Sequence, residues 1–430
     1  MAENKKEVRK MSEKTATAVK APENALKPQR ERIMSIDRFR GAVIFSMIFF
    51  QMLKDFKGLE LLSRIAEHDH EKGIEILPGM MLADVIAPMF MFAIALTIKS
   101  SYESRKAKYG TKKTVCHFLS RYSALIGIGG ILCGVNTFLG DTSFNFNHMV
   151  DYIFVVLTFA VLGFGLIALI CNIKPLKKAQ KVFKKILFVI VFASAALCVI
   201  TAVRDFVMIV RYGTEVDTWG YWLVLQAIGA AGLITLAFIN FKTYIRAIAA
   251  VVMLGAYGIF HEIGNNVEVL DKIAQGGFLG SFAWGSMVIL GTVMADLYFA
   301  DRAKRSRYLI ALPILGVAAF AVSMVSDLNF GSVSPSFVLV ALFISSVAFI
   351  IFDFFNFYKG KFDPLSWWGK NPILMYLLEF AFVGGMREII GSGTMAEASD
   401  VFGVCYCVIM ALILTLIAYI LNKKNKIIKL

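Results

Sequence analysis

The chain has 430 residues, 58% of them hydrophobic, and its mean hydropathy is +0.68. A soluble domain of this length is not so apolar throughout, so a membrane protein is indicated. The net charge is +14, but most Lys and Arg residues lie in short loops and at the termini, where they anchor and orient membrane spans. We therefore expect the lipid bilayer as a partner and no nucleic acid.

Residues 1–30 precede the first apolar run, which begins near Gly41, and no cleavable signal peptide is evident. They are rich in Lys, Glu, Ala and Pro and lack a sustained apolar face. We expect a disordered, basic cytoplasmic tail here, followed by one transmembrane domain over residues 31–425.

Twelve apolar runs follow the tail. A helix needs about 20 residues to cross about 30 Å of hydrocarbon, and only helices or closed barrels satisfy their backbones there; the long unbroken runs exclude a barrel. The sequence predicts an all-α, polytopic membrane helix bundle of 11–12 transmembrane helices. The predicted spans are 35–55, 81–99, 117–138, 150–171, 185–209, 221–240, 244–260, 280–298, 308–325, 336–356, 371–390 and 402–421.

The connecting loops alternate in charge. The N-terminal tail and every second loop are basic, whereas loops 139–149, 326–335 and 391–401 carry no Lys or Arg. The positive-inside rule then places both termini in the cytoplasm. Four of the five histidines fall on the opposite, extracytoplasmic side, and His117 is the exception.

Two outer loops place histidine beside carboxylates. Residues 67–71 read Glu-His-Asp-His-Glu, which includes His68 and His70, and His261 precedes Glu262. A carboxylate orients the imidazole ring and raises its basicity, as a general base requires. The alternative is that these loops are simply polar and acidic because cations are kept inside. The six cysteines show no metal-type spacing, and no metal is expected.

Several ionisable residues lie in or near the spans, where charge is expensive and so often functional. Asp37 and Arg40 open the first span three residues apart and can pair on a helix; a plain helix cap is the alternative. Asp84 begins the second span and is followed by Pro88, so helix capping competes with a catalytic role. Arg121, near the inner end of the third span, can meet a phosphate or extend to the interface.

Four segments carry a family resemblance. Residues 35–41 (S-I-D-R-F-R-G) look like an S-x-D-x-x-R-G signature, and residues 82–92 (L-A-D-V-I-A-P-M-F-M-F) like an A-D-L-x-x-P-x-F-x-F segment. Residues 334–339 (S-P-S-F-V-L) and 368–376 (W-G-K-N-P-I-L-M-Y) resemble S-S-F-V-L and G-x-N-x-[IL]-x-x-Y segments. In this order they resemble the heparan-α-glucosaminide N-acetyltransferase family, part of a wider transmembrane acyltransferase superfamily.

The resemblance implies transfer of an acetyl group from cytosolic acetyl-CoA, as co-substrate, to an amino sugar across the membrane. It also implies an essential histidine in the loop between the first two spans. At the family's spacing this chain has Ile74, so His70 is the closest candidate and His68 the next, with His261 as a reserve base. We expect Asp84 to complete the catalytic group.

Four residues are candidate ligands for acetyl-CoA. Asp37, Arg40 and Asn371 lie in the matched segments, and Arg121 lies near the cytoplasmic end of its span.

The function predicted from the sequence is a transmembrane acyltransferase whose acceptor is a glycan-like or other extracytoplasmic amine or hydroxyl. The alternatives are a transporter or flippase for a glycan or lipid-linked envelope intermediate, and a non-catalytic membrane subunit. We expect a bacterial inner membrane. A homodimer, the acyl chain, and the choice between an acetyl-histidine intermediate and direct transfer stay open.

Overall fold

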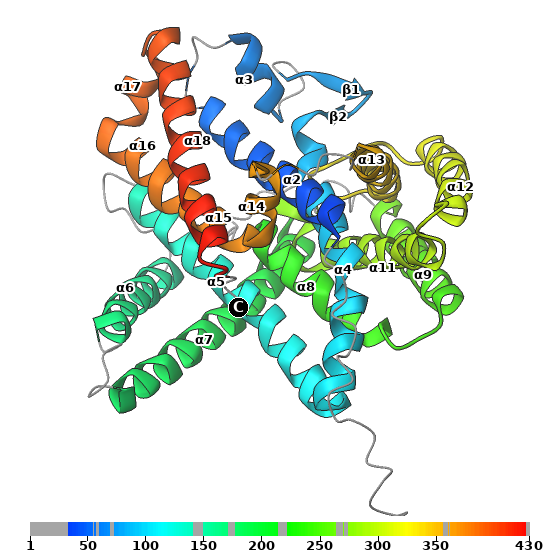
Figure 1. Ribbon diagram of the computed structural model, residues 1–430, viewed down its shortest axis with the longest axis horizontal. Helices are drawn as coiled ribbons and strands as arrows, with labels where there is room; N and C mark the ends of the chain where they lie inside the picture. The colour runs from blue at the N-terminus through cyan, green and yellow to red at the C-terminus, as the bar shows by residue number, and fades with distance from the viewer. Residues whose placement is uncertain are drawn as a thin grey trace, which may run out of the picture. The chain divides into compact units, whose positions relative to one another are not determined.

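The computed structural model describes residues 33–54, 56, 60–68, 73–140, 149–170, 177–213, 222–263, 270, 274–355, 360 and 362–426. The predicted tail, residues 1–30, lies outside these residues. Ser35–Leu430 forms one compact unit, and the elements below belong to it (Figure 1).

Helices dominate the described residues, in agreement with the predicted all-α class. The first half of the chain contains α2 (Met34–Leu53), α3 (Glu60–Ala66), the two-stranded antiparallel hairpin of β1 (Glu75–Leu77) and β2 (Met80–Met81), η1 (Ala83–Val85), α4 (Ile86–Tyr109), α5 (Thr111–Gly140), α6 (Met149–Ile170) and α7 (Lys177–Tyr212). The second half contains α8 (Val224–Phe238), α9 (Thr243–Glu262), η3 (Ala274–Gly276), α11 (Gly277–Ala300), α12 (Ser306–Ser323), α13 (Pro335–Phe354), α14 (Pro364–Lys370), α15 (Pro372–Glu379), the π-helix η4 (Phe380–Gly384), α16 (Gly385–Ile390), α17 (Ser392–Ala396) and α18 (Asp400–Lys423).

Every one of the twelve predicted spans overlaps a helix. Within the described part of the chain, nine helices are long and apolar enough to cross a membrane. The other three spans differ for physical reasons: α2 carries Asp37, Arg38 and Arg40 in its first turns, α8 has only 15 residues, and the span 371–390 is divided into α15, η4 and α16. The chain is thus a multi-pass helical membrane protein.

Burial separates inner helices from outer ones. In the most apolar stretch of α11, 72% of the residues are buried inside the protein, and α11 packs against α4, α8 and α9. In the corresponding stretch of α12 only 17% of the residues are buried, with Ile310, Ile314 and Val317 exposed. In a membrane protein, apolar side chains of this kind face lipid, so α11 belongs to the core and α12 to the periphery.

A close crossing of α2 and α14 positions the first turns of α2. A methyl group at Gly41 would overlap the carbonyl oxygen of Leu365, and one at Gly369 would overlap that of Asp37. Small residues let helix backbones approach in this way. Asp363 caps α14 by accepting a hydrogen bond from the Ser366 N–H, and its other oxygen accepts one from Nε of Arg38 at 2.8 Å.

Candidate functional site

A cavity of about 210 Å³, lined by both apolar and polar side chains, lies at the end of α2 that the charge pattern places outside the cytoplasm. Its wall is formed by α2, η1, the beginning of α4, α8, the turn at Gln275, the loop at Phe330 and α15. The polar side chains in this wall are Gln51, Lys54, His68, Gln275, Tyr376 and Glu379.

His68 lines the cavity and forms a pair with the buried Asp84 behind it. Nδ1 of His68 lies 2.5 Å from Oδ1 of Asp84. Asp84 is 3% exposed, and its Oδ2 accepts a hydrogen bond from the Met81 N–H at 2.8 Å. Because the carboxylate only accepts, Nδ1 carries the ring proton and Nε2 is the basic nitrogen. Asp84 makes no helix cap, since neither η1 nor α4 has a side-chain cap.

Phe330 holds the His68 ring in place. The two rings stack with centroids 5.3 Å apart and planes 6° from parallel. Phe330 in turn packs edge-on against Phe337 of α13. The imidazole is therefore fixed on one face by an aromatic ring and at one nitrogen by a carboxylate, although its side chain is 42% exposed.

Lys54, Gln51 and Glu379 add charged and hydrogen-bonding groups to the cavity wall. Lys54 follows the last residue of α2 and lies close enough to Glu67 and Asp84 for attraction between their charges. Glu379 is 7% exposed and ends α15, immediately before the π-helix. Single π-turns within helices are often found at functional sites. This cavity thus offers both donors and acceptors to a small ligand.

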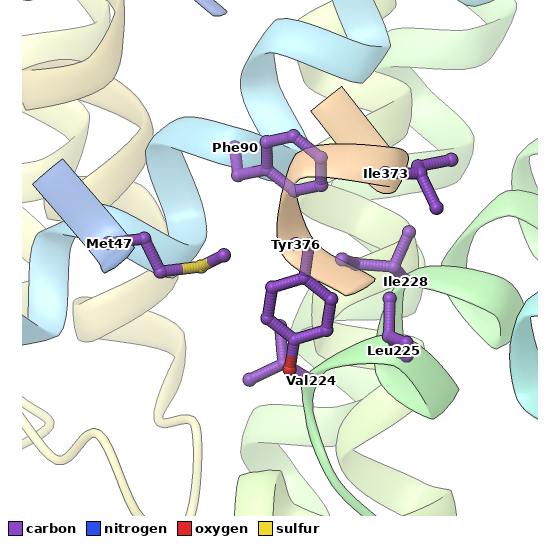
Figure 2. A pocket seen from close by; sticks show the side chains of 7 residues that line it. All are labelled: Met47, Phe90, Val224, Leu225, Ile228, Ile373 and Tyr376. Carbon is purple, nitrogen blue, oxygen red and sulfur yellow. The ribbon is translucent and has the colours of Figure 1, made fainter. Parts of the chain in front are cut away.

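An apolar seam adjoins the cavity. Met47, Val224 and Tyr376 line both the cavity and a gap of about 10 Å³ that Phe90, Leu225, Ile228 and Ile373 complete. Figure 2 shows these side chains converging from α2, α4, α8 and α15. Ile373 is two residues from Asn371, so this side of the gap lies near the junction of α14 and α15.

A second polar cluster lies at the opposite end of α2. Arg40 lies 3.8 Å from Asp37, so the predicted pair forms, and it also donates to Oγ1 of Thr97 at 3.0 Å and to the Gly369 carbonyl at 3.4 Å. Asp37 is 4% exposed. This cluster joins the first matched segment to the one around Gly369.

The other two predicted acetyl-CoA ligands differ in their surroundings. Asn371 precedes α15 two residues after Gly369, is 3% exposed and donates from Nδ2 to the Lys426 carbonyl at 3.1 Å. Arg121 lies on α5, and its buried Nε finds no hydrogen-bond partner among the described residues.

His261 belongs to a separate network. Its Nδ1 lies 2.9 Å from Oε1 of Glu262, so the predicted neighbours interact, and its Nε2 lies 2.8 Å from Oγ of Ser332. His261 is 2% exposed and does not line the cavity. Both ring nitrogens are thus engaged. His70, the histidine closest to the family spacing, lies outside the described residues.

Three further cavity residues had different signals in the sequence. Glu379 could be noticed as the deepest acid of its span, but Gln275 in η3 and Phe330 in a loop carry no sequence pattern that marks them. Their placement depends on turns that bring distant segments together.

Comparison of the sequence with models of protein families gives no match, and comparison with curated proteins gives none either.

Proposed function

We propose that the protein is a transmembrane acyltransferase that moves an acetyl or other acyl group from cytosolic acyl-CoA to an extracytoplasmic amine or hydroxyl of a sugar-like acceptor. The observation that carries this proposal is the His68–Asp84 pair at the cavity, with Nδ1 and Oδ1 2.5 Å apart. Asp84 comes from a matched segment, and His68 comes from the loop in which the resemblance implies an essential histidine. A bacterial inner membrane is the location that we propose.

His68 acts as the general base in this mechanism. Its Nε2 takes the proton from the acceptor N–H or O–H as the acceptor atom attacks the thioester carbonyl carbon. The tetrahedral intermediate carries an oxyanion, for which Gln51 and Lys54 are donors in the cavity wall. The C–S bond then breaks, and CoA leaves as a thiol after receiving the proton from the imidazolium. An acetyl group carried on Nε2 is the alternative route.

The donor approaches from the cytoplasmic end. Arg40 and Gln51 are eleven residues apart on α2, so a rise of 1.5 Å per residue separates them by about 16 Å. The cluster of Asp37, Arg40 and Asn371 would hold the nucleotide end of CoA, with Arg40 as the phosphate ligand. The pantetheine arm would follow the seam past Ile373 and Tyr376 to bring its thioester to His68.

The experiment uses the purified full chain in detergent with radiolabelled acetyl-CoA. Wild type is compared with His68→Ala, His70→Ala and His261→Ala for CoA binding, slow thioester hydrolysis and acetyl transfer to glucosamine. We expect turnover that is lost in His68→Ala and retained in His261→Ala. Loss in His70→Ala alone would transfer the role of base to that residue, and a folded wild type that neither binds nor consumes acetyl-CoA would contradict the proposal.

A transporter is the second candidate, and the π-helix that interrupts the span after Glu379 favours it. Interrupted helices commonly form substrate sites in transporters. A transporter predicts sugar accumulation in proteoliposomes without any dependence on acyl-CoA. The acyltransferase predicts that acetylated product appears only when acetyl-CoA is present on the side of Arg40.

A further inference from the structure

The turn between α9 and α11 holds Gln275 in an unfavourable backbone conformation at the cavity. Gln275, Gly276 and Gly277 have φ values of 60°, 65° and 60° in succession. Left-handed backbone is accessible to glycine, whereas a residue with a Cβ is disfavoured there. Gln275 is the only one of the three that carries a side chain, and that side chain lines the cavity.

The Gln275 amide has an unused acceptor. The residue is 7% exposed, and its buried Oε1 finds no hydrogen-bond partner among the described residues. A buried carbonyl oxygen without a partner is unfavourable and rare in folded proteins, so water or a ligand usually supplies the missing donor. Strained backbone of this kind also clusters at ligand sites.

Two hydrogen bonds hold the turn and the end of α9 against the loop that carries Phe330. The Gly276 N–H donates to the Gly331 carbonyl at 2.9 Å, and the Tyr257 hydroxyl donates to the Ser332 carbonyl at 2.5 Å. Because Phe330 of this loop stacks on His68, the same packing holds both Gln275 and the basic histidine at one cavity. The backbone of Gln275 is thereby held in place relative to His68.

We propose that Gln275 is a ligand-recognition residue, which accepts a hydrogen bond at Oε1 from an O–H or N–H of a small hydroxyl- or amine-bearing molecule in the cavity. Glu379 adds a carboxylate to the same wall, so an ammonium group on the ligand gains a counter-charge there. As an assignment of the acceptor subsite this inference rests on the proposed acyltransferase function, but its binding chemistry is measurable separately.

The test measures binding to the purified full chain through the ligand-induced shift of its melting temperature. Glucosamine and methyl α-glucoside are the probes, because only the first carries an ammonium group. Gln275→Met keeps the length of the side chain and removes the amide, and we expect it to weaken probe binding about tenfold, the size of one hydrogen bond. Gln275→Gly removes both strain and amide, so it should raise the melting temperature of the ligand-free protein and weaken binding equally.

Asn425→Gly is the matched control, since it relieves another left-handed residue (φ 48°) at the end of α18. It should leave probe affinity at the wild-type value. If glucosamine alone binds, its ammonium group is assigned to Glu379. If both probes bind, a shared hydroxyl is assigned to Gln275. Either result supports the proposal when Gln275→Met weakens the binding of the probe.

Three results would overturn this assignment. The first is wild-type affinity in Gln275→Met, and the second is a folded wild type that binds neither probe. The third is a Gln275→Gly protein that is more stable but binds as well as wild type, which would mean that Oε1 of the wild type accepts only from water. If instead Gln275-dependent binding is found but acetyl-CoA is never consumed, acyl transfer fails while the recognition role stands.

Discussion

Nδ1 of His68 and Oδ1 of Asp84 lie 2.5 Å apart although the residues are 16 positions apart in the chain. The connection between them runs through β1 and β2, and Asp84 is held by the Met81 N–H at the end of this hairpin. The pair therefore has one fixed partner on the carboxylate and one fixed ring face on the histidine. This arrangement orients the ring through Nδ1 and one ring face, so Nε2 can act as the base.

The first prediction concerns the tautomer of His68. Asp84→Asn places an amide beside Nδ1, which can donate to this nitrogen and so favour the proton on Nε2. We expect acetyl transfer to glucosamine to fall by roughly 10²-fold or more, the size of general base catalysis. The change should lower kcat more than it alters the KM for acetyl-CoA.

Glu75→Gln is the control for this prediction, because Glu75 lies on the same hairpin and its carboxylate accepts a hydrogen bond from the Gly79 N–H at 2.7 Å. It should transfer acetyl groups at the wild-type rate. Equal rates for Asp84→Asn and Glu75→Gln, in folded protein, would remove Asp84 from the catalytic group.

The second prediction concerns the crossing of α2 and α14. Gly41→Ala and Gly369→Ala each place a methyl group against a backbone carbonyl that cannot rotate away. We expect each to destabilise the protein by about 1–3 kcal/mol, the usual cost of overpacking, seen as a lower melting temperature in detergent. Gly163→Ala on α6, where nothing lies within 4 Å, should be neutral or stabilising. An unchanged melting temperature in Gly41→Ala would contradict the close crossing.

The helical segments could be predicted from the sequence because hydropathy directly reflects burial in lipid. The boundaries were less accurate where a helix extends beyond the apolar run. The predicted span 185–209 is helical from Lys177 to Tyr212, since lysines tolerate helical backbone outside the bilayer. Among the described residues, three of the predicted spans do not form one long apolar helix, because α2 carries charge, α8 is short and a π-helix interrupts the span 371–390.

The candidate site was only partly predictable. His68, Asp84, Asp37 and Arg40 could be found because titratable residues near spans are conspicuous, and each of the two pairs forms in the structure. The choice of His68 over His261 required the fold, since His261 uses both ring nitrogens within the protein.

Gln275 could not be found in the sequence at all. Its positive φ and its unpaired Oε1 arise from the packing of its turn against the loop of Phe330, and no local sequence pattern encodes that contact.

The third prediction concerns a buried cation between α9 and α11. Arg246 is fully buried, and its guanidinium pairs with Asp296, which also accepts from Lys99 Nζ at 2.7 Å and from Thr243 Oγ1 at 2.6 Å. Asp296→Asn leaves a buried positive charge without its counter-charge. We expect a loss of about 3–5 kcal/mol in the free energy of unfolding, measured by chemical denaturation in detergent.

Glu103→Gln is the matched control for Asp296→Asn. Its carboxylate lies 3.9 Å from the same Lys99 but is 53% exposed, and an exposed pair of this kind contributes about 0–1 kcal/mol. If both variants lose similar stability, the buried pair has no special role in holding α9 on α11.

The fourth prediction concerns the seam between the two ends of α2. Ile373→Trp fills the gap that Met47, Phe90 and Tyr376 surround. Because Arg40 and its partners are not altered, acetyl-CoA should still bind, while acetyl transfer to glucosamine falls at least about tenfold if the pantetheine arm must pass here. Ile310→Trp on the exposed face of α12 controls for the added ring. Wild-type transfer by a stably folded Ile373→Trp protein would exclude this seam as the route of the acyl group.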